Sequence, residues 1–220
     1  MAKREAGEDG GARPDGVDHL IFGAPDLEQG VEEVRRRLGV RPAGGGRHPQ
    51  YGTRNALLAL GRETYLEVMA PDPEQSAPDR GRLFGLDHFE RPRLVTWALR
   101  REEIEEVAAR GRDQRVELGP VQAVNREQPD GTLLTWRLTD PYAGPAGGVV
   151  PFLIAWGETP HPAGSAPQGG SLAALRAVHP QPEAVRNALE ALGVEMRVER
   201  GDRPRLIATI RTGEGRVELR

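Results

Sequence analysis

A histidine and a glutamate in two strand-like runs are the residues of this chain best suited to chemistry. His19 lies in VDHLIF, and Glu67 lies 48 positions later in TYLEVMA. A glutamate inside an apolar strand needs a partner, because an isolated buried carboxylate is costly and would otherwise take up a proton. His19 is the obvious partner if both strands line one cavity. The pair could then bind a metal ion, or Glu67 could act as a base.

The alternation of side chains along a strand predicts which residues share a face with His19. Successive side chains point to opposite faces, so His19 is expected to share a face with Val17 and Ile21. Asp18 is then expected on the opposite face, pointing away from His19.

A glycine-rich segment between the two strands supplies further polar side chains. In GGGRHPQYGTRN, His48 follows three glycines, and glycine lets the backbone approach a ligand closely. His48 is therefore a catalytic candidate beside Glu67. His161 lies in a proline-flanked loop after the apolar run VVPFLIAW. The expected ligand pocket consists of His48, Tyr51, Arg54, Asn55, Tyr65, Trp156 and His161.

These residues belong to a pattern of strands and one helix that occurs three times in the sequence. In the first copy, Asp26 can cap a helix with an apolar stripe at a 3.6-residue spacing, and Gly39 can end that helix. Similar helices follow strand-like runs that begin at Arg93 and Ser171. The predicted organisation is a disordered tail at 1–16, βαβββ modules at 17–71 and 93–157, a shorter module at 171–220, a connection at 72–92 and a linker at 158–170.

The composition argues against several classes of protein. The absence of cysteine excludes disulfides, thiolate metal sites and cysteine nucleophiles. Basic residues are scattered among acidic ones and the net charge is -3, which argues against a nucleic-acid partner. No run approaches about 18 apolar residues, so we expect no membrane partner and a cytoplasmic location. There is also no P-loop, GxSxG or GxGxxG motif.

The first module resembles a known family. VDHL, GGRHPQYGTRNALLALG and YLEVMAP occur in the order typical of glyoxalase-like domains of the vicinal oxygen chelate superfamily. The resemblance continues more loosely through PFLIAW and His161. It implies an α+β fold in which repeated βαβββ modules form a curved, mostly antiparallel sheet around a cavity, with helices on the outside.

The resemblance also implies a metal site. In metal-using members, each of two modules supplies one ligand from its first strand and a glutamate from its last, around one divalent ion. His19 and Glu67 match the first pair. Aligning VDHLIF with LVTWAL puts Thr96 at the third position, and aligning YLEVM with FLIAW puts Ile154 at the fourth. Neither is a credible ligand, and pairing of the first and third modules would add Glu218 instead.

Two functional hypotheses therefore stand side by side. In the first, the protein is a metal-assisted lyase, isomerase or dioxygenase that acts on a small oxygenated molecule, with Zn, Mn, Fe or Ni held by His19 and Glu67. In the second, it is a metal-free protein that binds and sequesters a small molecule in the same cavity, as resistance proteins of the superfamily do. We also expect a homodimer, because three modules leave one without a partner.

Overall fold

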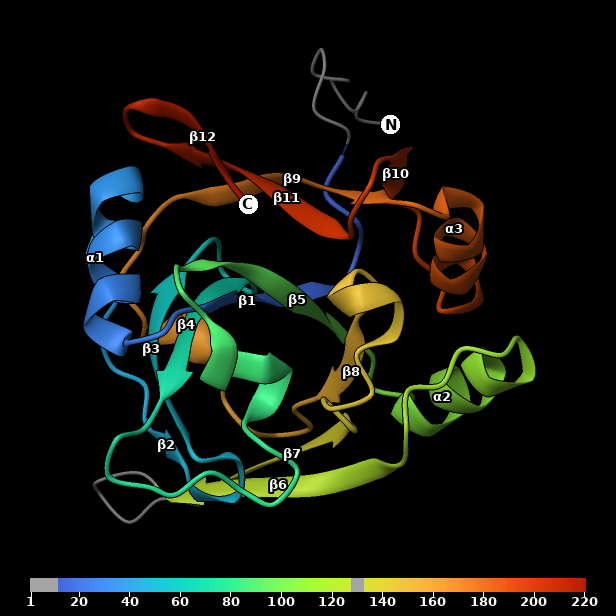
Figure 1. Cartoon of the computed structure of the whole chain (residues 1–220), viewed down its shortest axis with the longest axis horizontal. Coiled ribbons are helices and arrows are strands. Elements are labelled where there is room, and N and C mark those ends of the chain that lie inside the picture. The colour runs from blue at the N-terminus through green and yellow to red at the C-terminus, as the bar shows by residue number, and fades with distance from the viewer. Residues whose placement is uncertain (1–11, 128–132) are drawn as a thin grey trace.

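The β-α-β-β-β order of elements occurs three times in the computed structural model, which describes residues 12–127 and 133–220 (Figure 1). The first module contains β1 (Val17–Gly23), α1 (Leu27–Leu38), β2 (Arg47–His48), β3 (Thr53–Ala59) and β4 (Tyr65–Pro71). The second contains β5 (Arg93–Arg100), α2 (Ile104–Asp113), β6 (Val121–Glu127), β7 (Leu133–Thr139) and β8 (Phe152–Ala155). The third contains β9 (Ser171–His179), α3 (Pro182–Ala191), β10 (Arg197–Arg200), β11 (Arg205–Thr212) and β12 (Gly215–Leu219). Short 3-10 helices lie in the connections: η1 (Pro49–Tyr51), η2 (Leu83–His88), η3 (Pro145–Gly148) and η4 (Pro162–Gly164).

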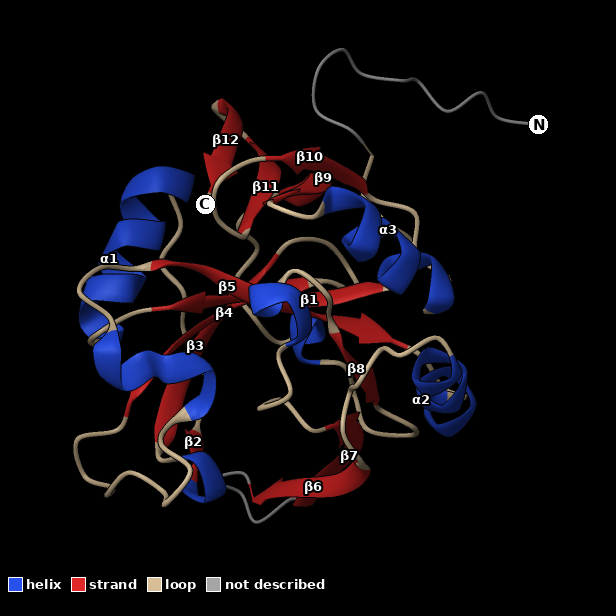
Figure 2. Cartoon of the chain, turned by 45° about the vertical axis from the view of Figure 1, so that its right-hand side comes forward, coloured by secondary structure: helices blue, strands red, loops and turns tan. Residues whose placement is uncertain are grey.

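The first two modules form one eight-stranded sheet in the order β2-β3-β4-β1-β5-β8-β7-β6. Their first strands, β1 and β5, pair antiparallel at its centre, and each has the last strand of its own module as a parallel neighbour. The sheet curls into a half-barrel with α1 and α2 on its outer side (Figures 1 and 2). The predicted α+β fold, with repeated modules in a curved, mostly antiparallel sheet, is confirmed.

The third module covers the outer face of this half-barrel. Its strands form a second sheet in the order β10-β9-β11-β12. Leu175 of β9 and Leu206 of β11 belong to the same apolar cluster as Trp97 and Leu99 of β5. The third module therefore has a partner within its own chain, which removes the reason for expecting a homodimer. The homodimer itself stays a prediction.

Helix α1 begins and ends at the residues that the sequence predicts. Asp26 accepts hydrogen bonds from two backbone N–H groups of the first turn, and Gly39 ends the helix in the left-handed conformation with φ 77°. The helix also lies close to β4, because a Cβ added to Gly30 would meet Val68 Cγ1 at 2.6 Å. This close packing fixes the strand that carries Glu67.

A β-bulge in β1 reverses the expected direction of Asp18. The pairing with β5 runs from Val17 with Leu99 to His19 with Ala98, so Asp18 is an extra residue in β1. An extra residue shifts the alternation by one place. Val17 accordingly lies in the outer apolar cluster, whereas His19 faces the inner side of the sheet. The predictions that Asp18 points away from His19 and that Val17 shares its face are wrong.

Part of the segment before β1 packs against the first module. Residues 1–11 of the predicted tail lie outside the described residues, but Arg13 Nη1 donates a hydrogen bond to Thr64 Oγ1 at 3.3 Å. As to membranes, no helix within residues 12–127 and 133–220 has the length and apolar character needed to span one.

Candidate functional site

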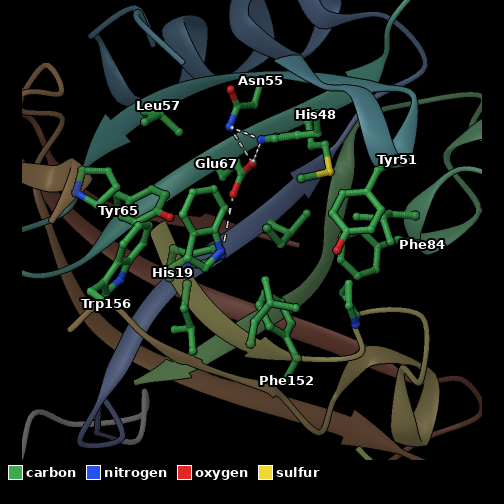
Figure 3. Close-up of a pocket in the computed structure, with 18 of the residues that line it drawn as sticks. His19, His48, Tyr51, Asn55, Leu57, Tyr65, Glu67, Phe84, Phe152 and Trp156 are labelled. Atoms are coloured by element: carbon green, nitrogen blue, oxygen red, sulfur yellow. Dashed lines mark hydrogen bonds and ion pairs between the residues drawn. The ribbon is translucent and has the colours of Figure 1, made fainter. Parts of the chain in front are cut away.

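A cavity opens on the concave face of the half-barrel, between the first two modules (Figure 3). About 700 Å³ of space lies among the lining residues, and part of it is open to solvent. The first module contributes mainly polar groups: His19, His48, Tyr51, Asn55, Tyr65 and Glu67. The second contributes apolar groups: Leu134, Trp136, Leu138, Phe152, Ile154 and Trp156. Leu83 and Phe84 of η2 complete the wall.

His19 and Glu67 face this cavity side by side. Strands β1 and β4 are parallel neighbours, and their register pairs Ile21 with Glu67. His19 Nε2 lies 3.6 Å from Glu67 Oε2, and the two side chains are 4% and 7% exposed. The structure thus brings the two chemical candidates together in one hollow. Their roles as metal ligands or as a base stay predictions.

The Asp18 carboxylate is buried behind His19 and accepts three hydrogen bonds. Its Oδ1 lies 2.7 Å from His19 Nδ1, and its Oδ2 lies 3.0 Å from Trp156 Nε1 and 3.1 Å from His161 Nε2. Burial raises the pKa of Asp18, but the hydrogen bonds that it accepts from His161 and His19 outweigh burial and lower that pKa below its ordinary value. Asp18 is therefore an ionised carboxylate in the core.

This carboxylate fixes the orientation of both imidazole rings. An ionised carboxylate only accepts hydrogen bonds, so His19 presents Nδ1–H to Asp18. His161 Nδ1 accepts from the backbone N–H of Ala163 at 3.3 Å, so the Nε2 of His161 carries the hydrogen that faces Asp18. Nε2 of His19 is consequently left to face Glu67 and the cavity.

Two aromatic rings hold the His19 ring from its sides. Tyr65 stacks on it with ring centroids 4.6 Å apart and an interplanar angle of 19°. Phe152 approaches edge-on with centroids 5.5 Å apart. The imidazole therefore has little freedom to rotate away from Asp18.

Asn55 links Glu67 to His48. Its Oδ1 accepts from the backbone N–H of Gly46 at 2.6 Å. Because a backbone N–H only donates, the amide nitrogen must point the other way. That Nδ2 lies 2.7 Å from Glu67 Oε1 and 3.5 Å from His48 Nε2 (Figure 3). An amide NH₂ group thus lies between the second histidine and the carboxylate.

The donor set around Glu67 does not fit the divalent ion that the resemblance implies. Protein sites for such ions generally supply three or more ligands. Within the described parts of the chain, no group of three His, Asp or Glu side chains is arranged to hold one. Asn55 gives the physical reason, because its NH₂ hydrogens occupy the direction in which Glu67 and His48 would have to meet a cation.

The second module supplies no partner for His19 at the matching position of its first strand. In the pairing of β1 with β5, His19 lies opposite Ala98 and Ile21 lies opposite Thr96. When the second module is superposed on the first, β5 takes the place of β1. Thr96 is then the equivalent of His19, in agreement with the sequence alignment. A threonine is not a credible ligand there.

The matching position for Glu67 carries a phenylalanine. The parallel registers place Glu67 beside Ile21 and Phe152 beside Ala98, and Ile21 and Ala98 are equivalent. Phe152 therefore takes the position that the sequence alignment gave to Ile154. The alignment was wrong by two residues because β8 spans only Phe152–Ala155, with no polar residue to mark its register.

Glu218 does not complete a metal site. It lies in β12 of the second sheet, where its Oε1 is 3.0 Å from Arg176 Nη2 and its Oε2 is 2.7 Å from Arg220 Nη2. The alternative in which the first and third modules enclose the cavity is therefore wrong.

Most of the expected pocket residues line the cavity, namely His48, Tyr51, Asn55, Tyr65 and Trp156. His161 reaches the site from behind, through Asp18. Arg54 is a correction: it is not among the lining residues, and its Nη2 lies 3.6 Å from Asp26 Oδ2 at the start of α1. Because side chains alternate along β3, the inward direction of Asn55 sends Arg54 to the outer face.

Asp18 is one of the site residues that the sequence analysis did not identify, and Phe152 is another. The sequence did contain a signal for Asp18. A carboxylate in an apolar strand needs partners, and this holds for Asp18 in VDHLIF as it does for Glu67.

The family model described as a glyoxalase-like domain matches residues 17–193. The comparison with curated proteins gave no match. Among solved structures, a protein of Staphylococcus aureus described as hypothetical has 16% identity and a TM-score of 0.64, covering 92% of this chain and 97% of that one.

Methylmalonyl-CoA epimerases are also among the similar structures. The Mycobacterium tuberculosis enzyme has 23% identity and a TM-score of 0.42, covering 66% of this chain and 91% of that one. A Streptomyces coelicolor variant in complex with 2-nitronate-propionyl-CoA has 20% identity and the same TM-score of 0.42, covering 66% and 97%. The family match spans most of the chain, from β1 to the end of the third module's helix. This chain therefore belongs to the glyoxalase-like domain family of the vicinal oxygen chelate superfamily.

Proposed function

We propose that this protein binds a small, largely apolar molecule in the cavity and that His19 moves a proton at the polar head group of that molecule. The observation that supports this proposal is the buried Asp18 carboxylate, which leaves Nε2 of His19 facing the cavity 3.6 Å from Glu67. The reaction class is an isomerase or lyase step that begins with proton abstraction.

His19 has the features of a positioned general base. When its Nε2 takes a proton, the imidazolium that forms is stabilised by Asp18 at 2.7 Å from Nδ1. Glu67 Oε2 lies 3.6 Å from that Nε2, so one ligand atom can contact both groups, and Asn55 holds the Glu67 carboxylate in one orientation. A base placed in this way contributes about 10²–10⁴-fold to a rate.

The rest of the cavity suits an apolar ligand body. Trp136 and Trp156 lie with ring centroids 5.4 Å apart, and Phe84 of η2 stacks on Phe152 at 6.4 Å. A ligand body that displaces water from these rings gains free energy in proportion to the area covered.

Superfamily members commonly use divalent metal ions, but the donor set here does not fit one, and no step of the proposed reaction passes through a metal. The proton chemistry rests on His19, Asp18 and Glu67 alone.

Binding without chemistry is the second candidate. The apolar wall of the second module supports it, since Trp136, Trp156 and Phe152 can hold a ligand whether or not His19 reacts with it. The two candidates differ in one respect: only the first changes a bond in the ligand.

Hydrogen exchange separates these candidates. 2-Indanone is a compact apolar ketone with acidic α-hydrogens, and we expect wild-type protein to accelerate their exchange for deuterium in D₂O, followed by ¹H NMR. His19→Ala should lower the protein-dependent rate by about 100-fold, because the positioned base is lost. His88→Ala, at an exposed histidine of η2, is the control and should match wild type. Equal rates for wild type and His19→Ala would leave binding alone as the function.

Metal content tests the donor set directly. After incubation with Zn²⁺, Mn²⁺, Fe²⁺ or Ni²⁺ and desalting, we expect less than one bound ion per chain, because His19 and Glu67 are two ligands and Asn55 presents hydrogens to the site. The measurement is elemental analysis of wild type beside His19→Ala and Glu67→Ala. One tightly bound ion in wild type that both variants lose would contradict this account.

The pH dependence of stability tests the ionised state of Asp18. Its pKa is lower in the folded protein, so its contribution to stability is present above about pH 4, the unfolded value, and is lost as pH falls toward the folded pKa. At pH 7, Asp18→Asn should lower the free energy of unfolding by about 2 kcal/mol. Urea titrations should show this difference narrowing between pH 5 and 3.

Asp79→Asn, at an exposed carboxylate, is the control for that series and should track wild type at every pH. A wild-type advantage over Asp18→Asn that grows in acid would show that Asp18 is protonated in the folded protein.

A further inference from the structure

Resting on the proposed function, the geometry points to the chemical class of the head group: we propose that the cavity takes an apolar molecule bearing a primary amine and disfavours carboxylates and phosphates. Three features support this choice: the hydrogen-bonding character of His19 and Glu67, the charge of the residues that line the cavity, and the aromatic rings around it.

Two neighbouring acceptor atoms, one from His19 and one from Glu67, face the cavity. With Nδ1–H toward Asp18, the neutral His19 ring presents Nε2 to the cavity as an acceptor. Glu67 Oε1 accepts from Asn55, while Oε2 faces His19 Nε2 at 3.6 Å. That separation is longer than a hydrogen bond. Two acceptors also cannot bond to each other unless a hydrogen lies between them.

One nitrogen atom can satisfy both acceptors. A donor placed about 2.9 Å from each of two atoms 3.6 Å apart lies within hydrogen-bonding range of both. An ammonium or amine has at least two hydrogens and can donate to His19 and Glu67 together, whereas a hydroxyl has one. A ligand carboxylate has none, and its charge would repel Glu67.

The charge of the surroundings favours the same choice. Among the described residues that line the cavity, Glu67 is the only one of the Asp, Glu, Lys and Arg types, and the ionised Asp18 lies directly behind His19. Two arginines just before Leu83 in the chain have acidic partners: Arg82 Nη1 lies 2.6 Å from Asp87 Oδ1, and Arg80 Nη2 lies 3.0 Å from Asp140 Oδ2. A phosphate or carboxylate would thus enter without a cationic partner, at a cost in desolvation.

The aromatic lining adds to the attraction for a cation. Tyr65 and Phe152 flank His19, and Trp136 and Trp156 also line the cavity. Aromatic faces attract ammonium groups by about 0.5–2 kcal/mol when the contact is shielded from water.

Three probes with one aromatic skeleton test the inference: 2-phenylethylamine, 2-phenylethanol and phenylacetate, titrated at pH 7 and followed by tryptophan fluorescence and calorimetry. We expect the amine to bind about ten-fold tighter than the alcohol and the carboxylate to bind weakest. Glu67→Gln should bring the amine to within about two-fold of the alcohol, and Glu67→Asp should keep part of the preference because it keeps the charge. Glu214→Gln, at an exposed carboxylate in the β11–β12 turn, is the matched control and should behave as wild type.

Phenylacetate binding tighter than the amine, or an amine preference that survives Glu67→Gln, would overturn the inference. If Glu67→Gln does not fold, as judged by thermal melting, the order of the three probes on wild type and Glu67→Asp decides. Saturable binding of the alcohol without an advantage for the amine would defeat this inference and leave the proposed function standing. Absence of binding by all three probes, together with no exchange of 2-indanone, would defeat both.

Discussion

A buried carboxylate with three donors is the constraint on which the rest of this site depends. Asp18 accepts hydrogen bonds from His19 in β1, from Trp156 just after β8 and from His161 in the segment that leads to the third module. An unpaired carboxylate in the core costs several kcal/mol, so all three donors must be in place in the folded chain. The same contacts that join the first two modules therefore also orient the imidazole that faces the cavity.

The two modules around the cavity have become chemically unequal. Equivalent positions carry His19 and Thr96 in the first strands, and Glu67 and Phe152 in the last strands. The wall from the first module therefore carries titratable and hydrogen-bonding groups, whereas the wall from the second module is mainly apolar and aromatic. This asymmetry leaves His19 and Glu67 without the two further metal ligands that the family resemblance implies.

Local patterns in the sequence were sufficient to predict the elements and the cavity-facing pair. Helix α1 has its N-terminal cap at Asp26 and its final glycine at Gly39, where the local sequence indicates them. The alternation in β4 placed Glu67 correctly because that strand pairs with β3 and β1 without a bulge. Asp18 was placed wrongly because the bulge in β1 depends on pairing with β5, about 80 residues away in the chain. Phe152 was missed for a related reason, since four apolar residues of β8 give no internal marker of register. The packing of the third module against the half-barrel is likewise a long-range result that alternation alone does not encode.

The protonation pattern of His19 tests the central claim most directly. In protein labelled with ¹⁵N-histidine, two-bond ¹H–¹⁵N spectra at pH 8 report which ring nitrogen carries hydrogen, and His19→Ala assigns the signal. This account predicts that Nδ1 of His19 is protonated and Nε2 is not, and that Asp18→Asn disturbs this pattern. A protonated Nε2 in the wild type, or an identical spectrum in Asp18→Asn, would contradict it.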